Sequence, residues 1–334
     1  MKEQSNSITE NSGVNPKEVS VNWRNFLKKF GSLLGLIILS VILAILSPDF
    51  LQADNLMNVA RQSSINALLA LGMLLPILTA GIDLSVGSLL ALAICSTGIF
   101  VIKWGMNPIL GILLCLAIGA LGGWLNGIML TKLKLPHPFI STLGTMNIFR
   151  GIALIITGAS PIFGFPTVIN YVGNNDLGIV PISFILVILI YFIFHVFLTR
   201  TSTGRYIYAI GSNKEAARLA GIPVDKVLIL VYTLSGLMAG LAGLVLIGRT
   251  NSASPIAGLS YELDAIAAVI IGGASFFGGV GSVWGTLIGA LIIAVLRNGL
   301  NLLGTTSDLQ VVVIGIVIIA AVYVDVLRQR SAKK

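Results

Sequence analysis

The sequence predicts an all-α polytopic membrane protein with about ten transmembrane helices. Hydrophobic residues make up 56% of the 334 residues and charged residues only 10%, with a mean hydropathy of +0.96. A soluble domain carries about a quarter charged residues. Because one span needs roughly 20 apolar residues, the chain has room for about ten spans.

Ten apolar segments are long enough to serve as these spans. We expect them over residues 30–47, 62–80, 84–102, 108–130, 138–157, 180–199, 226–248, 263–279, 282–303 and 309–327. They form one transmembrane domain over 30–327, between a tail of residues 1–29 and a short tail of residues 328–334. The polar start of the chain, 1–22, lacks a signal-peptide cleavage pattern and is typical of a disordered cytoplasmic tail.

The distribution of Lys and Arg predicts the orientation in the membrane, since cytoplasmic loops carry the excess. Sixteen of these residues lie in the two tails and in the loops after the fourth and sixth spans, whereas the opposite loops hold only Arg61, Lys103 and Arg249. The sequence therefore predicts a multi-pass protein of the plasma (inner) membrane with both termini in the cytoplasm. Nucleic acid is not an expected partner, because the basic residues follow the topology.

The loop from Gly211 to Pro223 predicts a short capped helix between two spans, on the cytoplasmic side. Ser212 and Glu215 have the spacing of a capping box. Gly221 suits the left-handed position after the helix, and Pro223 blocks continuation. The loop resembles the one by which permease subunits of ABC importers dock on their ATPase, and the coupling residues would be Glu215, Ala216, Ala217, Arg218 and Gly221. A solvated connecting helix is the alternative.

The segment AGIDLSVGS, residues 80–88, interrupts the apolar pattern between the second and third spans. Asp83 and Ser85 could line a permeation path or its gate, since a charge at membrane depth needs a partner or water. For Asp83 itself we expect the capping of the third helix, a role that can coexist with lining the path.

Further polar side chains lie inside the apolar spans. The amides join helices by hydrogen bonds or offer weak partners to a hydroxylated solute; as path residues we expect Asn66, Asn126, Asn147 and Asn298. Arg150 and Arg297 face a water-filled cavity or form ion pairs between helices.

Two similar stretches indicate an internal repeat. IGAL occurs at 118–121 and at 288–291, followed by Asn126-Gly127 and Asn298-Gly299 respectively. The two spans run in opposite directions in the predicted topology, which is the pattern of an inverted repeat with the substrate path between the halves. Chance similarity between Gly/Ala-rich helices is the alternative.

Motifs for catalysis or nucleotide hydrolysis are missing from the sequence. There is no GxxxxGK[ST] phosphate loop, metal-ligand cluster or nucleophile elbow. Cys95 and Cys115 lie in apolar runs, where thiols pack as small hydrophobic groups. We therefore expect a transport subunit that is not an enzyme, has no cofactor and does not hydrolyse ATP itself.

Four stretches of the chain resemble the ribose-type carbohydrate permeases of ABC importers. They are AGIDLSVGSLLAL at 80–92, the docking-type loop, SYELDAIAAVIIGGASFFGGVGSVWGTLIGA at 260–290 and RNGLNLLG at 297–304. Ala80 departs from the family, which has glycine there. The resemblance implies the ten-helix fold of the larger importer class, with a pathway at the interface of a homodimer. Its implied partners are the ABC ATP-binding subunit, an extracytoplasmic sugar-binding protein and membrane lipid.

The resemblance implies import of a monosaccharide, most simply ribose. Another sugar, a nucleoside, a branched-chain amino acid or a signalling furanoside remains possible, as does an ion-coupled transporter, for which Asp83 is the one candidate carboxylate. The acidic outer loops predict where the binding protein docks, at Tyr261, Glu262 and Asp264.

Overall fold

The computed structural model describes residues 23–133, 135 and 137–332, with side chains for 31–133, 135 and 137–326. The chain separates into a first unit, 1–31, and a second, 32–334. The described part of the first unit, 23–31, is the start of one helix, and everything below concerns the second unit. The predicted tail 1–22 lies outside the described residues. At the other end the last helix continues through Ala332, so the predicted tail from 328 is largely helical.

Helices form nearly all of the described structure. In chain order they are α1 Trp23–Leu46, α2 Ala53–Leu78, α3 Val86–Gly98, α4 Pro108–Lys132, α5 Pro138–Thr157, α6 Thr167–Asn174, α7 Ile182–Arg200, α8 Ser202–Ser212, α9 Lys214–Leu219, α10 Val224–Thr250, α11 Tyr261–Ile271, α12 Val283–Leu302 and α13 Ser307–Ala332, with a π-helical turn at Ile99–Lys103. The strands are β1 Ile162–Phe163, β2 Asp176–Leu177, β3 Val180–Pro181 and β4 Ser252–Ala253. Both sheets are two-stranded and antiparallel, β1 with β4 and β2 with β3.

The predicted all-α membrane fold is confirmed. Eight helices of the described residues are long and apolar enough to cross a membrane, and α1 adds a shorter apolar stretch, Gly31–Leu46. The predicted eighth span is the exception, because α11 ends at Ile271 and not at 279. Its helix stops at Gly272 and Gly273, of which the second has a left-handed φ of +94°. Hydropathy had counted this glycine-rich loop as part of the span.

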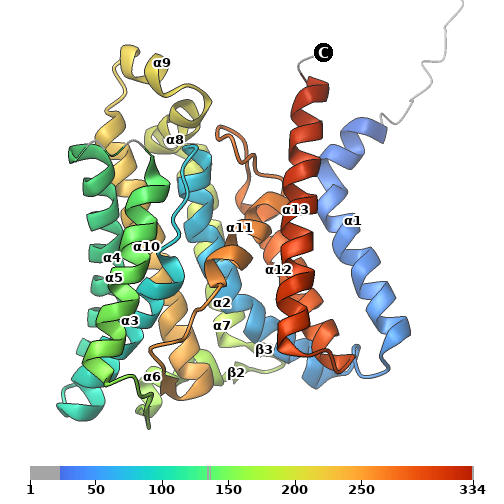
Figure 1. Cartoon of the computed structure of the whole chain (residues 1–334). Coiled ribbons are helices and arrows are strands. Elements are labelled where there is room, and N and C mark those ends of the chain that lie inside the picture. The colour runs from blue at the N-terminus through green and yellow to red at the C-terminus, as the bar shows by residue number, and fades with distance from the viewer. Residues whose placement is uncertain (1–22, 134, 136, 333–334) are drawn as a thin grey trace, which may run out of the picture. The chain divides into compact units, whose positions relative to one another are not determined.

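Two helices, α3 and α11, begin inside the bundle rather than at its surface. After α2 the chain turns back into the interior as the irregular segment 79–85, and α3 begins there (Figure 1). After α10 the segment 251–260 does the same from the opposite end and leads into α11. Both short helices are 11 to 13 residues long. Irregular backbone at this depth is tolerated only where protein surrounds it.

The packing of the helices has the form of the predicted inverted repeat. α2 and α10 pack against each other and run in opposite directions (Figure 1). α10 packs on α3 and α4, and in the same way α2 packs on α11 and α12; α3 contacts α5 as α11 contacts α13. Exchanging α2–α5 with α10–α13 leaves this pattern unchanged. The two IGAL stretches lie on the matched helices α4 and α12.

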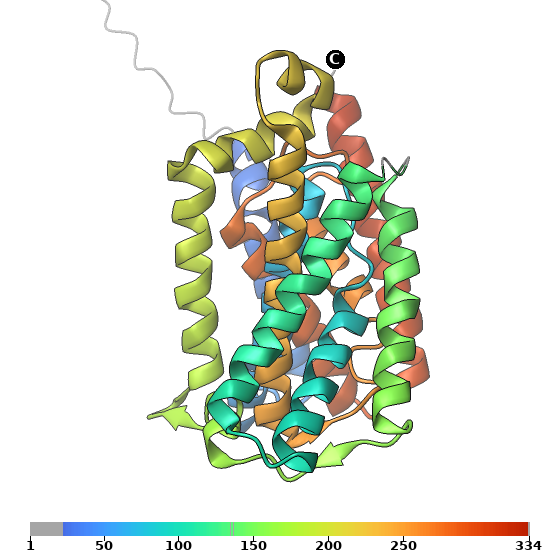
Figure 2. The same cartoon turned by 90° about the vertical axis from the view of Figure 1, so that its left-hand side faces the viewer.

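Glycines allow the central helices to approach closely. A Cβ on Gly119 of α4 would lie 3.0 Å from the Gly240 backbone of α10, and one on Gly123 would lie 3.0 Å from the nitrogen of Gly236. Figure 2 shows α4 and α10 crossing in front of the bundle. The GxxxG pair Gly236 and Gly240 thus lies in a close helix contact within the subunit.

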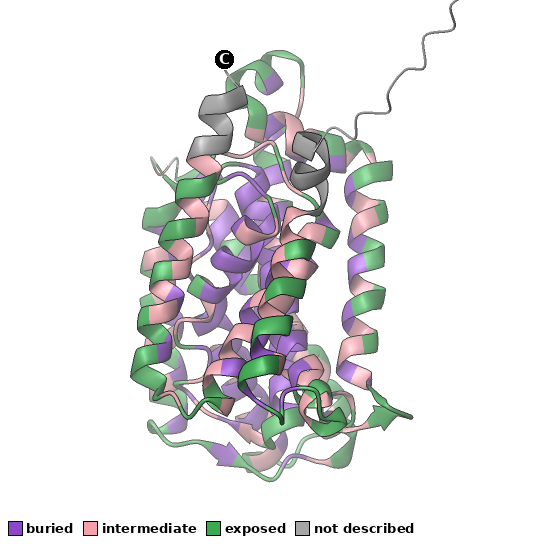
Figure 3. Cartoon of the chain, turned by 90° about the vertical axis from the view of Figure 1, so that its right-hand side faces the viewer, coloured by how far each residue is buried: buried purple, intermediate pink, exposed green. Residues whose placement is uncertain are grey.

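Burial divides the helices into an inner and an outer set. α2 is buried from Ile65 to Leu78 with only Asn66 partly exposed, whereas α13 exposes a row of apolar side chains (Figure 3), among them Val312, Ile316 and Ile319. Apolar side chains facing outward are what a helix in contact with lipid or another subunit requires.

Candidate functional site

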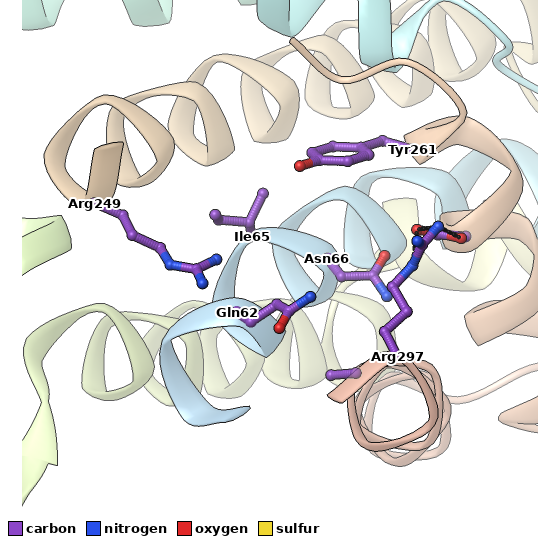
Figure 4. Close-up of a pocket in the computed structure, with 8 residues that line it drawn as sticks. Gln62, Ile65, Asn66, Arg249, Tyr261 and Arg297 are labelled. Atoms are coloured by element: carbon purple, nitrogen blue, oxygen red, sulfur yellow. Dashed lines mark hydrogen bonds and ion pairs between the residues drawn. The ribbon is translucent and has the colours of Figure 1, made fainter. Parts of the chain in front are cut away.

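A polar pocket lies between α2, α10, α11 and α12. Its volume is about 110 Å³, and its walls are Gln62, Ile65, Asn66, Arg249, Tyr261, Asp264, Ala294 and Arg297. Figure 4 shows Gln62, Asn66, Tyr261 and Arg297 directed toward the same space. These residues come from four helices; α2 is distant in sequence from the other three, whereas α10, α11 and α12 follow one another along the chain. Most pockets of small-molecule sites have this mixture of apolar wall and few convergent polar groups.

The floor of the pocket is an ion pair. Arg297 donates from Nε to Asp264 Oδ2 at 3.0 Å and from Nη2 to Oδ1 at 2.8 Å, a two-pronged geometry that fixes both side chains. Asp264 is only 4% exposed. The prediction that Asp264 docks a binding protein is therefore wrong, because its carboxylate is committed inside the bundle. Tyr261 and Glu262 are half-buried on the same turn of α11.

Asn66 and Arg249 complete the pocket without partners of their own. Within the described residues, Asn66 Oδ1 is buried and accepts no hydrogen bond. Arg249, near the end of α10, is exposed and forms no ion pair or hydrogen bond with another described residue. A buried acceptor without a donor costs roughly 1–3 kcal/mol, so the pocket favours an occupant that brings hydroxyl or amide donors.

Asp83, Ser85 and Asn126 form a second polar cluster, fully buried at the start of α3. Asp83 accepts hydrogen bonds from Ser85 Oγ at 2.6 Å and from Ser235 Oγ of α10 at 2.9 Å. Asn126 Nδ2 donates to Ser85 Oγ at 2.8 Å, and Asn126 Oδ1 accepts from Thr145 Oγ1 of α5 at 2.7 Å. All five residues have no exposed surface. The cluster joins three helices to segment 79–85.

The predicted helix cap at Asp83 is wrong. The N-cap of α3 is Ser85, whose side chain makes no capping bond, and the backbone N–H of Ser85 donates to Asp83 Oδ1 at 3.1 Å. Two further predicted path residues lie elsewhere. Asn147 is exposed and donates to the carbonyl of Leu143 within its own helix, and Asn298 pairs with Asn55 of α2. Of the residues predicted to line the path, Asn66 is the one in the wall of this pocket.

Among the described residues Arg150 forms no ion pair, which is one of the two contacts expected for it. Its Nη1 donates to the carbonyls of Pro255 at 2.5 Å and Ala257 at 2.7 Å, which holds segment 251–260 against α5. Next to this contact the starts of α3 and α11 meet: a Cβ on Gly87 would lie 2.7 Å from Glu262 Oε2. The two irregular segments therefore converge near the middle of the bundle.

The short helix α9 projects from one end of the bundle (Figure 1). Its N-cap is Asn213, whose Oδ1 accepts from the nitrogen of Ala216 at 3.0 Å. The predicted capping box of Ser212 and Glu215 is wrong, since Ser212 still belongs to α8 and donates to the carbonyl of Tyr208. Glu215 pairs with Arg218 at 3.1 Å.

The end of α9 has the predicted form. Gly221 has a left-handed φ of +80°, and the nitrogens of Gly221 and Ile222 donate to the carbonyls of Arg218 and Ala217. This is a Schellman motif, and it directs the chain into α10.

Helix α8 ties this end of the bundle to the pocket-bearing helices. Gly279, in the loop after α11, donates from its nitrogen to the carbonyl of Leu78 at the end of α2, at 3.0 Å. Gly211 of α8 contacts both, and Tyr208 Oη donates to the carbonyl of Gly281 at 3.0 Å. Burial raises the pKa of the Tyr208 hydroxyl, so it stays a donor. We call this contact of Gly211, Leu78, Gly279 and Tyr208 the junction.

Several of these residues carry little functional signal in the sequence. Gln62 and Tyr208 stand in unremarkable helical positions, and Arg249 had counted only as one of three basic residues in the outer loops. Asp264 and Arg297 were each noticed without the other, because 33 residues separate them.

Comparison with known proteins places the chain among transport proteins. The family described as "Branched-chain amino acid transport system / permease component" matches residues 55–322. The ribose import permease protein RbsC of Bacillus subtilis (strain 168) is 47% identical over 93% of this chain and 96% of its own length, and that of Escherichia coli (strain K12) is 44% identical over 89% and 94%. The D-allose transport system permease protein AlsC of Escherichia coli (strain K12) is 42% identical over 91% and 93%. No solved structure matches the chain.

Proposed function

Because this chain belongs to the branched-chain amino acid transport system / permease component family, we propose that it is the membrane subunit of an ATP-driven importer for ribose. The observation that supports ribose as the substrate is the 47% identity to a ribose import permease over nearly the whole of both chains. Relatives named for allose, fructose and xylose, at 42%, 40% and 36% identity, make another monosaccharide the second candidate.

The ATPase subunit docks on α9. This helix projects from the bundle, and Leu219 at its end is 90% exposed. An exposed leucine on a capped helix is suited to insert into an apolar groove on a partner, and the ion pair of Glu215 and Arg218 lies on the same helix. Ala216, Ala217 and Gly221 then supply the shape of the contact. The end of the bundle that carries α9 would face the cytoplasm, together with both termini.

The junction transmits the motion of α9 to the bundle. α9 is joined to α8 by Asn213 alone, and α8 holds the end of α2 and the loop after α11 at once. A push on α9 therefore moves the two helices that carry Asn66 and Asp264. Transport needs such a link, because a solute path has to change its exposure from one side of the membrane to the other.

The remaining partners occupy other faces of the chain. A sugar-binding protein docks at the end opposite α9, where exposed Asp49, Asp54 and Asp308 form an acidic surface; Asp264, which is buried, takes no part. A second copy of the chain and membrane lipid share the outward apolar surface, to which α13 contributes.

Uptake by reconstituted vesicles tests the proposal. The chain, with the ATPase subunit that co-purifies with it and the cognate binding protein, should accumulate radiolabelled ribose only when ATP is present, and vanadate should stop the uptake. Unlabelled ribose should compete better than allose or xylose. Uptake that is insensitive to vanadate and collapses with an uncoupler would identify an ion-coupled transporter instead.

A further inference from the structure

A further pocket lies at the end of the bundle that carries α9, and we call it the inner pocket. It is bounded by the chain between α2 and α3, the end of α4, the end of α8, the start of α9 and the first part of α10. Its volume is about 260 Å³, and it shares no described lining residue with the pocket around Asn66. Among its walls are Gly81, Leu130, Ser212, Lys214, Leu228 and Tyr232.

Tyr232 gives the inner pocket a buried polar group without a partner. The side chain is 1% exposed, and its hydroxyl forms no hydrogen bond with any described residue. The hydroxyl lies against the chain between α2 and α3, because a Cβ on Gly81 would lie 2.5 Å from Tyr232 Oη. A buried hydroxyl that lacks a partner carries its full desolvation penalty. The deep end of the pocket therefore favours an occupant with an oxygen atom that accepts this hydrogen bond.

Positive charge lies at the exposed edge of the pocket. Lys214 is exposed and forms no ion pair within the described residues. It also lines an adjoining hollow together with Thr131, Arg218 and Asp225, of which Asp225 is the carboxylate. Arg218 is paired with Glu215, but a guanidinium has five N–H donors and keeps some of them for a second anion. An anion at this edge can bind the free amine of Lys214 and a remaining donor of Arg218.

The walls between these two ends are largely apolar. Leu130 and Leu228 are buried, and Pro138 and Ile210 lie beside them in the wall. Small-molecule sites are typically apolar clefts of about 300–1,000 Å³ with a few polar groups at defined positions. A volume of about 260 Å³ is near the lower limit of this range, which suits a compact ligand with one charged end.

We infer that the inner pocket binds a small phosphate ester from the cytoplasm, and that this ester is a phosphorylated monosaccharide. The phosphate binds Lys214 and Arg218, a hydroxyl oxygen of the sugar accepts the hydrogen bond of Tyr232, and the carbon face lies on Leu130 and Leu228. The choice of a sugar ester rests on the proposed function. An imported neutral sugar stays in the cell once a phosphoryl-transfer reaction has charged it, because a charged ester does not recross the hydrocarbon core. The headgroup of an acidic lipid has the same phosphate chemistry, and the experiment separates the two.

The position of the inner pocket predicts that its ligand inhibits transport. Lys214 belongs to α9 and Tyr232 to α10, so a ligand bound to both ties the docking helix to the bundle. Gly211 of the junction also lines the pocket, and a displacement of α8 and α9 would change the shape of the site. A ligand that fits the resting arrangement better stabilises it by the difference between its two affinities. Import would therefore slow as the phosphorylated product accumulates.

Protection of a single cysteine from labelling measures the binding. In the complex with the ATPase subunit, Ser212→Cys is labelled with a small neutral methanethiosulfonate reagent, with and without ribose 5-phosphate at millimolar concentration. Cys95 and Cys115 are buried and do not compete for the reagent. We expect ribose 5-phosphate to slow the labelling of this chain at least threefold. The control Ser202→Cys, exposed on α8, should react at one rate in both conditions.

Hydrolysis of ATP by the complex in phosphatidylcholine nanodiscs, with loaded binding protein, measures the inhibition. Tyr232→Phe should raise the concentration of ribose 5-phosphate needed for half-inhibition at least fivefold. The uninhibited rate of this variant should not change, since the oxygen that it lacks has no described partner. Lys214→Gln should also weaken the inhibition, relative to its own uninhibited rate. The matched control Lys226→Gln removes an exposed charge of α10 outside the walls of the pocket and the hollow, and it should be inhibited like the unaltered chain.

The outcomes separate a sugar phosphate from other occupants. Equal labelling of Ser212→Cys with and without ribose 5-phosphate overturns the inference, and so does inhibition that Tyr232→Phe and Lys214→Gln leave unchanged. Inorganic phosphate that protects as well as the ester overturns it, because the sugar would then contribute nothing. Nanodiscs of phosphatidylglycerol test the lipid. If this lipid protects Ser212→Cys and ribose 5-phosphate has no effect in phosphatidylcholine, the pocket holds a lipid headgroup and the inference is overturned.

Failure of the inference is distinguishable from failure of the proposed function. ATP-driven ribose uptake by the unaltered chain, together with unprotected Ser212→Cys, overturns the regulatory site and leaves the importer in place. Protection of Ser212→Cys without ATP-driven ribose uptake supports a site for a phosphate ester and overturns the proposed function. Absence of both overturns both. Co-purification of each variant with the ATPase subunit shows that it has folded.

Discussion

Gly211→Ala should uncouple the bundle from its ATPase without unfolding it. A Cβ on residue 211 would lie 2.5 Å from the nitrogen of Gly279 and closer still to the carbonyl oxygen of Leu78. Ordinary contact begins near 3.4 Å. The Gly279 nitrogen alone would require α8 to withdraw by 0.9 Å, the difference between 3.4 and 2.5 Å, and the closer Leu78 oxygen requires more. Overpacking of this kind costs about 1–3 kcal/mol.

This destabilisation acts at the junction, because the atoms nearest to residue 211 belong to Leu78 and Gly279. If about 2 kcal/mol of it opposes the coupled state, sugar-stimulated ATP hydrolysis falls roughly 30-fold, at 1.36 kcal/mol for each factor of ten. Co-purification with the ATPase subunit should persist, since α9 itself is unchanged. The assay is hydrolysis by the reconstituted complex, with and without loaded binding protein.

Gly144→Ala is the matched control for this variant. Gly144 lies in the middle of α5, where a Cβ would meet no atom within 4 Å, so hydrolysis should equal that of the unaltered chain. A Gly211→Ala complex whose hydrolysis is stimulated as strongly as the control would refute the junction as the route of coupling.

The remaining predictions concern docking, the pocket floor and topology. Gly221→Val places a β-branched residue at φ +80° with no atom within 4 Å, which costs about 1 kcal/mol in backbone strain; the protein should reach the membrane in normal amount and lose co-purification with the ATPase, and retained co-purification would argue against docking on α9. Asp264→Asn leaves Arg297 unpaired, which costs about 3–5 kcal/mol, so the Tm in detergent should fall clearly; an unchanged Tm would show that the pair is not needed. A cysteine at Ser202 should react only from the cytoplasm and one at Asn175 only from outside, and the reverse pattern would invert the topology.

Hydropathy predicted the helices well because each long span must satisfy its backbone internally and cover itself with apolar side chains. It located nine spans to within a few residues at most boundaries and failed where the chain is apolar without being helical. The stretch after Ile271 is rich in glycine and phenylalanine, and Gly278 and Gly279 take left-handed φ values of +85° and +71°. A hydropathy window cannot distinguish such a loop from a helix.

The sequence motif predicted the wrong N-cap for α9, because two suitable N-cap residues are adjacent in the chain. Ser212 and Asn213 are both good N-cap residues, and Glu215 completes the box only with Ser212. Helix α8 runs through Ser212, whose hydroxyl bonds backward to Tyr208, and this leaves the cap to Asn213. The extent of the preceding helix decides the outcome, and no local motif encodes it.

The pocket could not be predicted, because its residues meet only through the crossing of four helices. Asn66 was predicted as a path residue for its polarity, but Asn126 and Asn298 share that polarity and bind neighbouring helices instead. Burial and partner choice separate these amides, and both depend on the rotation of each helix about its axis.

The two irregular segments differ in when their partners are synthesised. Segment 251–260 is held by Arg150, which is translated about 100 residues earlier. This partner is therefore already present when the segment emerges from the ribosome. Segment 79–85 depends on Asn126 and Thr142, and its carboxylate on Ser235, which follows Asp83 by 152 residues. The first half of the protein must therefore keep a carboxyl group with incomplete hydrogen bonding at the membrane until α10 has been translated, so biogenesis is most vulnerable between the insertion of α3 and that of α10.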